Sequence, residues 1–273
     1  MERAMSQNTV ASYCSDVEQF LSFYNGPLAD VSNTHVEHFL LDCSHRSKRS
    51  QARMLSSLRS FFKWLVVEKT LQDNPCDKVD SPKLGLYIPE VLSIDEVESV
   101  INSVDESTWV GLRDRALLEV LYGCGLRVSE AVNLKISHLY PDEGFVRVVG
   151  KGDKERLVPI GEMALDAVAR YLDERPMEFS GVETVFLNRY GSPLSRVSAF
   201  KTVKKLASLA GIAKEISPHT FRHSFATHLM EGGADIRLVQ EMLGHESVST
   251  TEIYTHIDTT TWHASILEHH PRR

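Results

Sequence analysis

Cysteine is scarce in this chain, and its distribution excludes two kinds of small domain. The four cysteines, Cys14, Cys43, Cys76 and Cys124, are scattered over 273 residues and include no C-x-x-C pair. Zinc knuckles hold their metal with such closely spaced pairs, and disulfide-rich secreted domains carry many more cysteines for their length. We therefore expect free thiols, with neither a metal site nor a disulfide framework.

Long apolar runs are absent as well. The N-terminal segment Met-Glu-Arg-Ala-Met-Ser-Gln lacks the apolar stretch of a secretory signal, and no later stretch approaches the roughly 20 apolar residues of a membrane-spanning helix. Hydrophobic residues still make up 42% of the chain, enough for one large core or two modest ones. We expect a cytoplasmic protein of two domains that has no membrane partner.

The net charge of the whole chain is -7, but two segments each contain charged residues of one sign only. Residues 44–63 include no Asp or Glu, and residues 90–106 include no Lys or Arg. Such a basic stretch is ordinarily a solvated face. The local field nevertheless decides what docks at a surface, so we expect a DNA-binding face formed by Arg46, Lys48, Arg49, Arg53, Arg59 and Lys63.

The first part of the chain has helical periodicity. Apolar residues recur at helical spacing over residues 10–24, and a second helix is predicted for residues 33–43. A third helix has an apolar stripe from Leu55 to Leu65, with the basic side chains on its other faces. Three prolines then mark an extended linker over residues 73–89.

We place a domain boundary in this linker, which gives a helical domain of residues 1–85 and a second domain of residues 86–273. The second domain opens with a predicted capping box at Ser93 and Glu96. Further helices are predicted at residues 115–122, 219–230, 236–243 and 250–256, with a short helix capped by Ser129.

Two short strands are predicted in the second domain, at residues 145–149 and 156–160. They flank the segment Gly150-Lys151-Gly152-Asp153-Lys154, which has the composition of a hairpin turn with lysine at its tip. The expected fold class is therefore mainly α, with a small β-hairpin or sheet in the second domain.

Three motifs of the second domain contain candidate functional residues. They are Gly125-Leu126-Arg127-Val128-Ser129-Glu130, then Ser217-Pro218-His219-Thr220-Phe221-Arg222-His223, and finally Leu243-Gly244-His245 followed by Tyr254-Thr255-His256. Each has an ordinary explanation when taken alone: a capped, solvated helix for the first and a half-buried core tyrosine for Tyr254. The step from His219 to His223 could hold zinc, but neither the H-E-x-x-H pattern nor a nearby cysteine completes a ligand set.

Taken together, with Lys151 between the first two, these motifs resemble the tyrosine recombinase and integrase family, and in particular the Xer recombinases that act on chromosomal dif sites. The resemblance implies a two-domain, C-shaped clamp on duplex DNA. It makes Tyr254 the nucleophile and Glu130 the acid that supports the first arginine. The other implied catalytic residues are Arg127, Lys151, His219, Arg222 and His245. Sequences of this family usually carry an earlier helical stretch, so we expect a shortened first helix.

The residue types suit this chemistry without reference to the family. Attack on a phosphodiester builds negative charge on the non-bridging oxygens, which two arginines such as Arg127 and Arg222 can stabilise. A phenol with a pKa near 10 is a poor nucleophile, so Tyr254 needs a base or a positive pocket. Lys151 or His219 could transfer protons. The phosphotyrosine bond retains the energy of the broken bond, so no metal, nucleotide or other cofactor is expected.

The expected function is site-specific recombination through a 3'-phosphotyrosine intermediate, resolving chromosome dimers at dif-like sites during cell division. The alternatives are a phage or transposon integrase with the same chemistry, although no additional arm-binding domain is apparent, and an inactive DNA-binding relative. Duplex DNA is the implied partner, bound by a homo- or hetero-tetramer with a second recombinase. The resemblance further implies that the terminal segment packs into a neighbouring subunit. It also suggests a septal DNA translocase as an activating partner.

Overall fold

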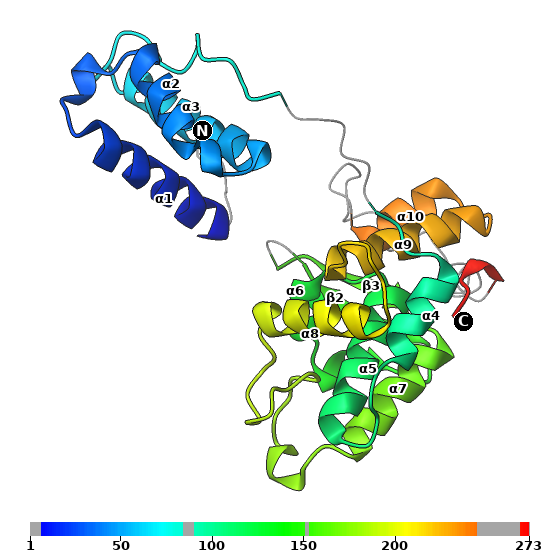
Figure 1. Cartoon of the computed structure of the whole chain (residues 1–273). Helices are drawn as coiled ribbons and strands as arrows, with labels where there is room; N and C mark the ends of the chain where they lie inside the picture. The colour runs from blue at the N-terminus through cyan, green and yellow to red at the C-terminus, as the bar shows by residue number, and fades with distance from the viewer. Residues whose placement is uncertain (1–6, 84–89, 151–152, 245–267, 273) are drawn as a thin grey trace. The chain divides into compact units, whose positions relative to one another are not determined.

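The computed structural model describes residues 7–83, 90–150, 153–244 and 268–272 (Figure 1). The contacts within the chain divide it into two compact units, Met1–Ile88 and Pro89–Arg273. The described elements are mostly helices with one small antiparallel sheet, which confirms the predicted fold class. No helix in these ranges is both long enough and apolar enough to cross a bilayer.

The first unit is built from helices around an aromatic core. It contains α1 (Gln7–Tyr24), η1 (Leu28–Asp30), α2 (Asn33–Asp42), η2 (Cys43–His45) and α3 (Lys48–Val67). The buried ring of Phe20 contacts Phe39 and Phe62 edge-on, with centroid distances of 5.4 and 5.7 Å. These three rings come from α1, α2 and α3, so each helix contributes to the same core.

Helix α3 has the amphipathic pattern that the sequence predicts. Leu55, Leu58, Phe62 and Leu65 are buried on one face. The helix begins at Lys48, because the Ser47 hydroxyl accepts a hydrogen bond from the amide of Ser50. The basic residues from Lys48 to Lys63 are therefore part of the helix, and Arg46 precedes it.

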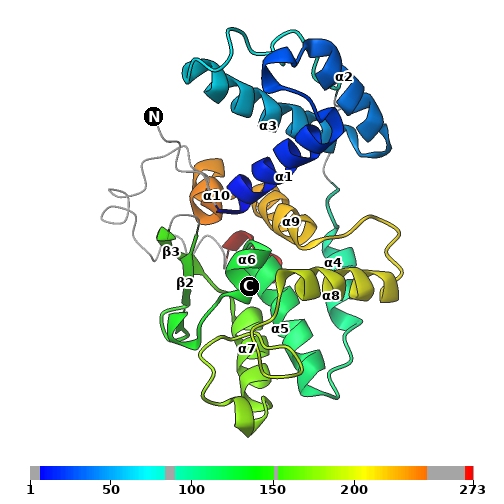
Figure 2. The same cartoon turned by 90° about the vertical axis from the view of Figure 1, so that its left-hand side faces the viewer.

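The second unit packs its helices around α5 (Trp109–Gly123), most of whose side chains are buried. Contacts with α7 (Glu162–Asp173) and α9 (Pro218–Glu231) cover α5 on two sides (Figure 2). The remaining helices are α4 (Ile94–Asn102), α6 (Val128–Val132), η3 (Ile136–His138), η5 (Met177–Phe179), α8 (Arg196–Leu209) and α10 (Ile236–Leu243). A single large apolar cluster links these elements.

The sheet has three antiparallel strands in the order β1 (Leu139–Tyr140), β2 (Phe145–Val149) and β3 (Glu155–Pro159). The predicted second strand begins and ends one residue earlier than expected, because the amide of Gly150 donates to the carbonyl of Lys154 at 2.8 Å and closes the turn there. β1 was not predicted, since two residues are too short for a periodic pattern.

Two predicted helix starts have different outcomes. The capping box at Ser93 is confirmed: its hydroxyl accepts from the amide of Glu96, and the Glu96 carboxylate accepts from the amide of Ser93. The prediction that Ser129 caps a helix is wrong. α6 begins at Val128 with Arg127 as the N-cap, because the Glu130 carboxylate accepts from the Arg127 amide. The helix predicted at residues 250–256 lies outside the described residues.

Candidate active site

Arg127 stands where the chain turns from α5 into α6. Gly125 makes this turn possible: its φ is +59°, and a Cβ there would lie 2.4 Å from the ring of Phe225. The Arg127 guanidinium donates from Nη1 to Oε1 of Glu130 at 2.8 Å, and its backbone amide donates to Oε2 at 2.8 Å. The side chain of Arg127 remains 37% exposed. It is therefore held in place and still accessible.

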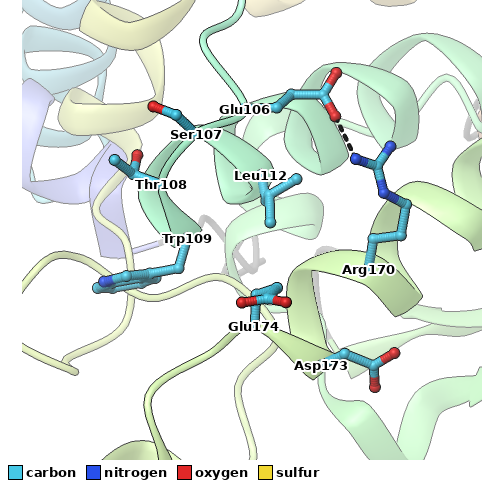
Figure 3. A pocket seen from close by; sticks show the side chains of 8 residues that line it. All are labelled: Glu106, Ser107, Thr108, Trp109, Leu112, Arg170, Asp173 and Glu174. Atoms are coloured by element: carbon cyan, nitrogen blue, oxygen red, sulfur yellow. Dashed lines mark hydrogen bonds and ion pairs between the residues drawn. The ribbon is translucent and has the colours of Figure 1, made fainter.

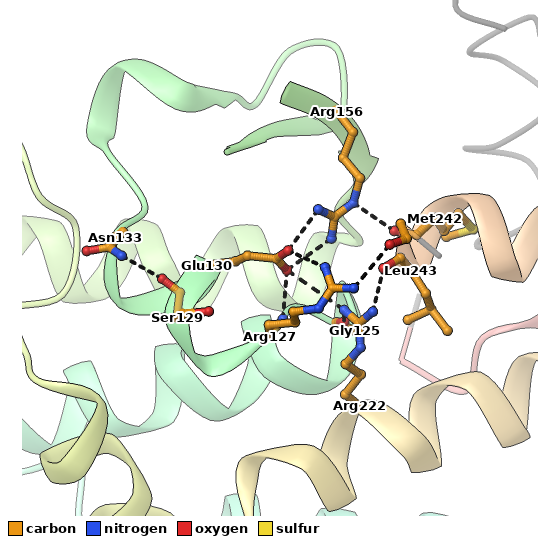
Figure 4. A network of polar contacts seen from close by, with 10 residues as sticks. Gly125, Arg127, Ser129, Glu130, Asn133, Arg156, Arg222, Met242 and Leu243 are labelled. Carbon is orange, nitrogen blue, oxygen red and sulfur yellow. Dashed lines mark hydrogen bonds and ion pairs between the residues drawn. The ribbon is translucent and has the colours of Figure 1, made fainter. Parts of the chain in front are cut away.

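Arg222 approaches the same place from α9. Its Nη1 donates to the carbonyl of Gly125 at 2.7 Å, and its Nη2 donates to the carbonyl of Leu243. Nη1 also lies 3.8 Å from Oε2 of Glu130. The tertiary structure thus brings together the two predicted catalytic arginines, Arg127 and Arg222, and the predicted supporting acid Glu130 (Figure 4). The two arginines come from different sequence motifs.

A third guanidinium belongs to this cluster, and the sequence analysis missed it. Arg156 of β3 donates from Nη1 and Nη2 to the two oxygens of Glu130, at 2.9 and 3.0 Å, and from Nε to the carbonyl of Met242 at 3.0 Å. Arg156 and Val158 share the buried face of β3. A charged residue at an inward strand position was the available signal, because a buried charge needs a partner.

The carboxyl end of α10 holds all three guanidiniums. The successive carbonyls of Met242, Leu243 and Gly244 accept hydrogen bonds from Arg156, Arg222 and Arg127 respectively. The last carbonyls of a helix have no partner within the helix and carry partial negative charge, so they suit cations. We call Arg127, Arg156, Arg222 and Glu130 the arginine cluster.

The arginine cluster carries an excess of positive charge, because three guanidiniums share one carboxylate. Burial raises the pKa of Glu130, but hydrogen bonds and charge from Arg156, with bonds from Arg127, outweigh it and bring this pKa below its ordinary value. Burial and the charge of Arg127 lower the pKa of Arg222 to about 10. At neutral pH Glu130 is therefore ionised and Arg222 protonated, a state suited to an oxyanion.

The remaining predicted catalytic residues have different positions. His219 is exposed on α9, three residues before Arg222 and so on the same side of the helix. Lys151, His245 and Tyr254 lie outside the described residues. Their neighbours Gly150 and Gly244 are described, and both lie against Arg156: a Cβ on Gly150 would be 3.7 Å from Nη1, and one on Gly244 would be 3.3 Å from Nε.

His228 has a packing role. It is buried on α9, and its Nδ1 lies 2.7 Å from the hydroxyl of Tyr122 on α5. Burial lowers the pKa of His228 below its ordinary value, which favours the neutral imidazole. His223, on the same helix, is half-buried.

The basic residues predicted to bind DNA fall into two groups. Lys48, Arg49, Arg53 and Lys63 are exposed on α3, and Arg53 is also paired with the buried Asp16. Arg46 and Arg59 are half-buried and bond within the first unit: Arg46 donates to Gln19, and Arg59 donates to the carbonyls of Cys76 and Val79 and to Ser81. Arg59 thus fixes the beginning of the linker.

A second basic surface was missed in the sequence. α8 has no acidic residue, and it exposes four basic side chains, Arg196, Lys201, Lys204 and Lys205. Its buried positions Ala199, Val203, Leu206 and Ala207 lie at helical spacing and could have revealed the helix. We call the exposed basic side the α8 face.

A hollow lies at the opposite end of α5 from the arginine cluster. It measures about 410 Å³ and is lined by Glu106, Ser107, Thr108, Trp109, Leu112, Arg170, Asp173 and Glu174 (Figure 3). Glu106 and Arg170 are paired across it at 2.7 Å. It shares no residue with the arginine cluster, so this hollow is not the candidate site.

Known families match both units of the chain. The phage integrase family matches residues 90–261, and the N-terminal SAM-like domain of phage integrases matches residues 1–69. The chain belongs to the phage integrase family of tyrosine recombinases. Such enzymes cleave and rejoin DNA through a tyrosine intermediate, so the predicted family and enzyme class are confirmed.

Relatives of this tyrosine recombinase match it over its full length. Tyrosine recombinase XerD of Chlorobaculum tepidum is 45% identical, with 100% of this chain and 93% of that protein covered. Tyrosine recombinase XerD of Listeria monocytogenes is 41% identical, with 100% and 95% covered. Among solved structures, XerH recombinase bound to palindromic difH substrate is 26% identical, with a TM-score of 0.74 and coverage of 94% and 78%. These similarities confirm a site-specific tyrosine recombinase.

Proposed function

We propose that this tyrosine recombinase resolves chromosome dimers at a dif-like site, with Arg127 and Arg222 stabilising the transition state and Tyr254 as nucleophile. The observation that carries the proposal is the arginine cluster, in which an ionised carboxylate and three helix-end carbonyls hold the guanidiniums. The full-length similarity to XerD proteins supports the cellular role and, with it, a cytoplasmic location.

The proposed reaction is an exchange of one phosphodiester for another. The Tyr254 oxygen attacks the phosphorus, forming a bond to the tyrosine while the bond to the 5'-oxygen breaks. The phenol loses its proton, and the leaving 5'-oxygen gains one, so the step consumes no other reactant. Negative charge on the non-bridging oxygens would meet Arg127 and Arg222, whose guanidinium forks match a phosphate. Rejoining is the same step in reverse.

Proton transfer is assigned to residues around the arginine cluster. Lys151 would protonate the leaving oxygen, since Gly150 holds the base of its turn against the cluster. His219, exposed near Arg222, and His245, one residue beyond Gly244, would complete the set. No step of this reaction requires a metal, because the arginines neutralise the charge that metals neutralise in other nucleases.

DNA binding is assigned to two basic surfaces. The exposed residues Lys48, Arg49 and Lys63 on α3 would contact phosphates, and the α8 face would provide a second set of contacts. In the proposed complex the two units form the arms of a C-shaped clamp on duplex DNA. Arg46 and Arg59 would contribute less, because they are half-buried and their guanidiniums are bonded within the first unit.

The proposed working form is a tetramer on two duplexes, because recombination cuts four strands. Solved structures that resemble this chain include lambda integrase as a dimer on a core site and as a tetramer on a Holliday junction, at about 20% identity. The paired subunits can be identical or contributed by a second recombinase. Activation by a septal DNA translocase belongs to the same proposal.

A suicide substrate tests the proposed chemistry. Fragments selected by the protein from genomic DNA supply the site, and a nick near the scissile phosphate lets the short cut strand diffuse away. The protein should become attached to a 3'-phosphate in the presence of EDTA and without nucleotide triphosphate. Tyr254→Phe should bind the same duplex without attachment. Attachment in that variant, or cutting that depends on added magnesium, would contradict the proposal.

A further inference from the structure

Arg156 is the one guanidinium of the arginine cluster to which the reaction assigns no task. Its side chain is 9% exposed, close to the 11% of Arg222 and well below the 37% of Arg127, so it faces the protein and not the solvent. All three of its nitrogens donate to protein acceptors, two to Glu130 and one to Met242. This geometry suits a residue that holds other groups in place.

The groups that Arg156 holds are the same groups that hold the two catalytic arginines. Oε1 of Glu130 accepts from Arg127 at 2.8 Å and from Arg156 at 2.9 Å. The carbonyl of Met242 precedes those of Leu243 and Gly244, which accept from Arg222 and Arg127. If Arg156 were absent, the carboxylate would lose two hydrogen bonds and the end of α10 would lose one, so both would be held less firmly against these partners.

We propose that Arg156 is a positioning residue of the recombinase, which locks Glu130 and the carboxyl end of α10 so that Arg127 and Arg222 meet the scissile phosphate in one fixed geometry. This inference rests on the proposed roles of Arg127 and Arg222. It assigns Arg156 no contact with DNA.

The shape of the side chain matters for this task. A guanidinium is planar and can bridge both oxygens of a carboxylate while its Nε donates in a third direction. A lysine carries the same charge at one point and cannot make these three bonds together. Since a displacement of about 1 Å can slow an enzyme by about 100-fold, loss of this brace would be visible in the cleavage rate.

A second substrate can show whether an Arg156 variant is slow because the catalytic arginines are misplaced or because the protein is damaged in general. A methylphosphonate at the scissile position replaces one non-bridging oxygen by a methyl group and removes the negative charge that the arginines stabilise. Single-turnover cleavage is measured on the suicide duplex with either linkage. The variants are Arg156→Met, Arg156→Lys and, as a reference, Arg127→Ala. Arg147→Met is the matched control, because Arg147 is on the neighbouring strand β2 and has no bond to Glu130 among those described.

Arg156→Met should cleave the phosphodiester about 100-fold more slowly than wild type, and Arg156→Lys should also be slow. On the methylphosphonate both variants should approach the wild-type rate, as should Arg127→Ala, while Arg147→Met behaves as wild type on both. The ratio of the two rates from one protein preparation does not depend on the folded fraction, so a destabilised variant still gives a valid result.

Equal slowing of the Arg156 variants on both linkages would overturn the inference and show a structural role only. A wild-type rate for Arg156→Met on the phosphodiester would overturn it too, as would full activity of Arg156→Lys. These results would leave the proposed function intact provided that wild type forms the covalent complex and Arg127→Ala recovers on the methylphosphonate. If wild type forms no covalent complex, the proposed function itself fails.

Discussion

Glu130 of α6 and Arg156 of β3 face each other through two parallel hydrogen bonds, of 2.9 and 3.0 Å, although they are 26 residues apart in the sequence. Both side chains are buried. The pair fastens the sheet to the short helix whose N-cap is Arg127. Removal of either partner would therefore disturb the candidate active site as well as the stability of the second unit.

Glu130→Gln should destabilise the protein strongly. The carboxylate neutralises part of the charge of the arginine cluster, and removing one partner of a buried ion pair costs about 3–5 kcal/mol. Urea unfolding of the full chain measures this loss. Glu143→Gln, which changes an exposed carboxylate just before β2, should stay within about 0.5 kcal/mol of wild type. Equal stability of the two variants would refute the prediction.

His270 should make stability depend on pH. Its ring is buried between Tyr122 and Phe225, and burial lowers the pKa of His270 to about 4. In the unfolded chain this pKa is about 6.5. Below that pH the unfolded chain binds a proton that the folded chain does not. The free energy of unfolding should therefore fall as pH drops from about 6.5 to 4, by at most about 1.4 kcal/mol per pH unit.

Urea unfolding at pH 7, 6 and 5 tests this dependence with His270→Phe as the comparison. The variant should lose less stability than wild type over the same range. A smaller slope will remain, because the pKa of the buried His228 is lowered in the same direction. Identical slopes for wild type and variant would show that His270 is not the group responsible.

Arg53→Ala should lower the stability of the first unit. Asp16 is 1% exposed and is paired with Arg53, so the variant leaves it with Ser57 as its remaining side-chain partner. A buried acceptor that loses its partner costs about 1–3 kcal/mol, and more when it is charged. Thermal unfolding compares this variant with Lys63→Ala, an exposed change on the same helix. Restoration of stability by the second change Asp16→Asn would identify the uncompensated charge as the cause.

Charge reversal on the α8 face should weaken DNA binding. Lys201→Glu removes a phosphate contact and should reduce the slope of log affinity against log salt by about 0.9 in magnitude. Lys48→Glu on α3 should have a similar effect. Lys78→Glu, an exposed reversal in the linker segment, is the control that accounts for the change in net charge. If all three variants bind alike at several salt concentrations, neither basic surface contacts DNA.

Sulfur at the 5'-bridging position should rescue the cleavage rate of the Lys151→Ala variant. A leaving alkoxide has a conjugate acid with a pKa near that of water, about 15.7, whereas a thiolate resembles cysteine at about 8.5 and needs no proton. The variant should cleave ordinary DNA at least about 100-fold more slowly than wild type does. It should cleave the phosphorothiolate nearly as fast as wild type. Arg222→Ala should gain no such benefit, because its charge acts on the non-bridging oxygens. Equal recovery of both variants would reassign the general acid to His219.

The sequence by itself determined the family, the fold class and most of the helices. Spacing was enough where one element carried the signal, as in the buried stripe of α3 from Leu55 to Leu65 and the capping box at Ser93. The family resemblance supplied the pairing of Arg127 with Glu130, which are three residues apart and bond to each other within one turn. Local periodicity and capping depend on neighbours in the sequence, which a reader of the sequence can see.

Only the tertiary structure decided which distant residues share a task. Arg156 has an ordinary strand position in the sequence, and nothing local shows that it will meet Glu130 and the end of α10. The same holds for Arg53 and Arg59, which the sequence groups with the exposed basic residues but which bond to Asp16 and to the carbonyls before the linker. Ion pairs between separate elements follow from packing, and packing depends on contacts that no spacing in the sequence records.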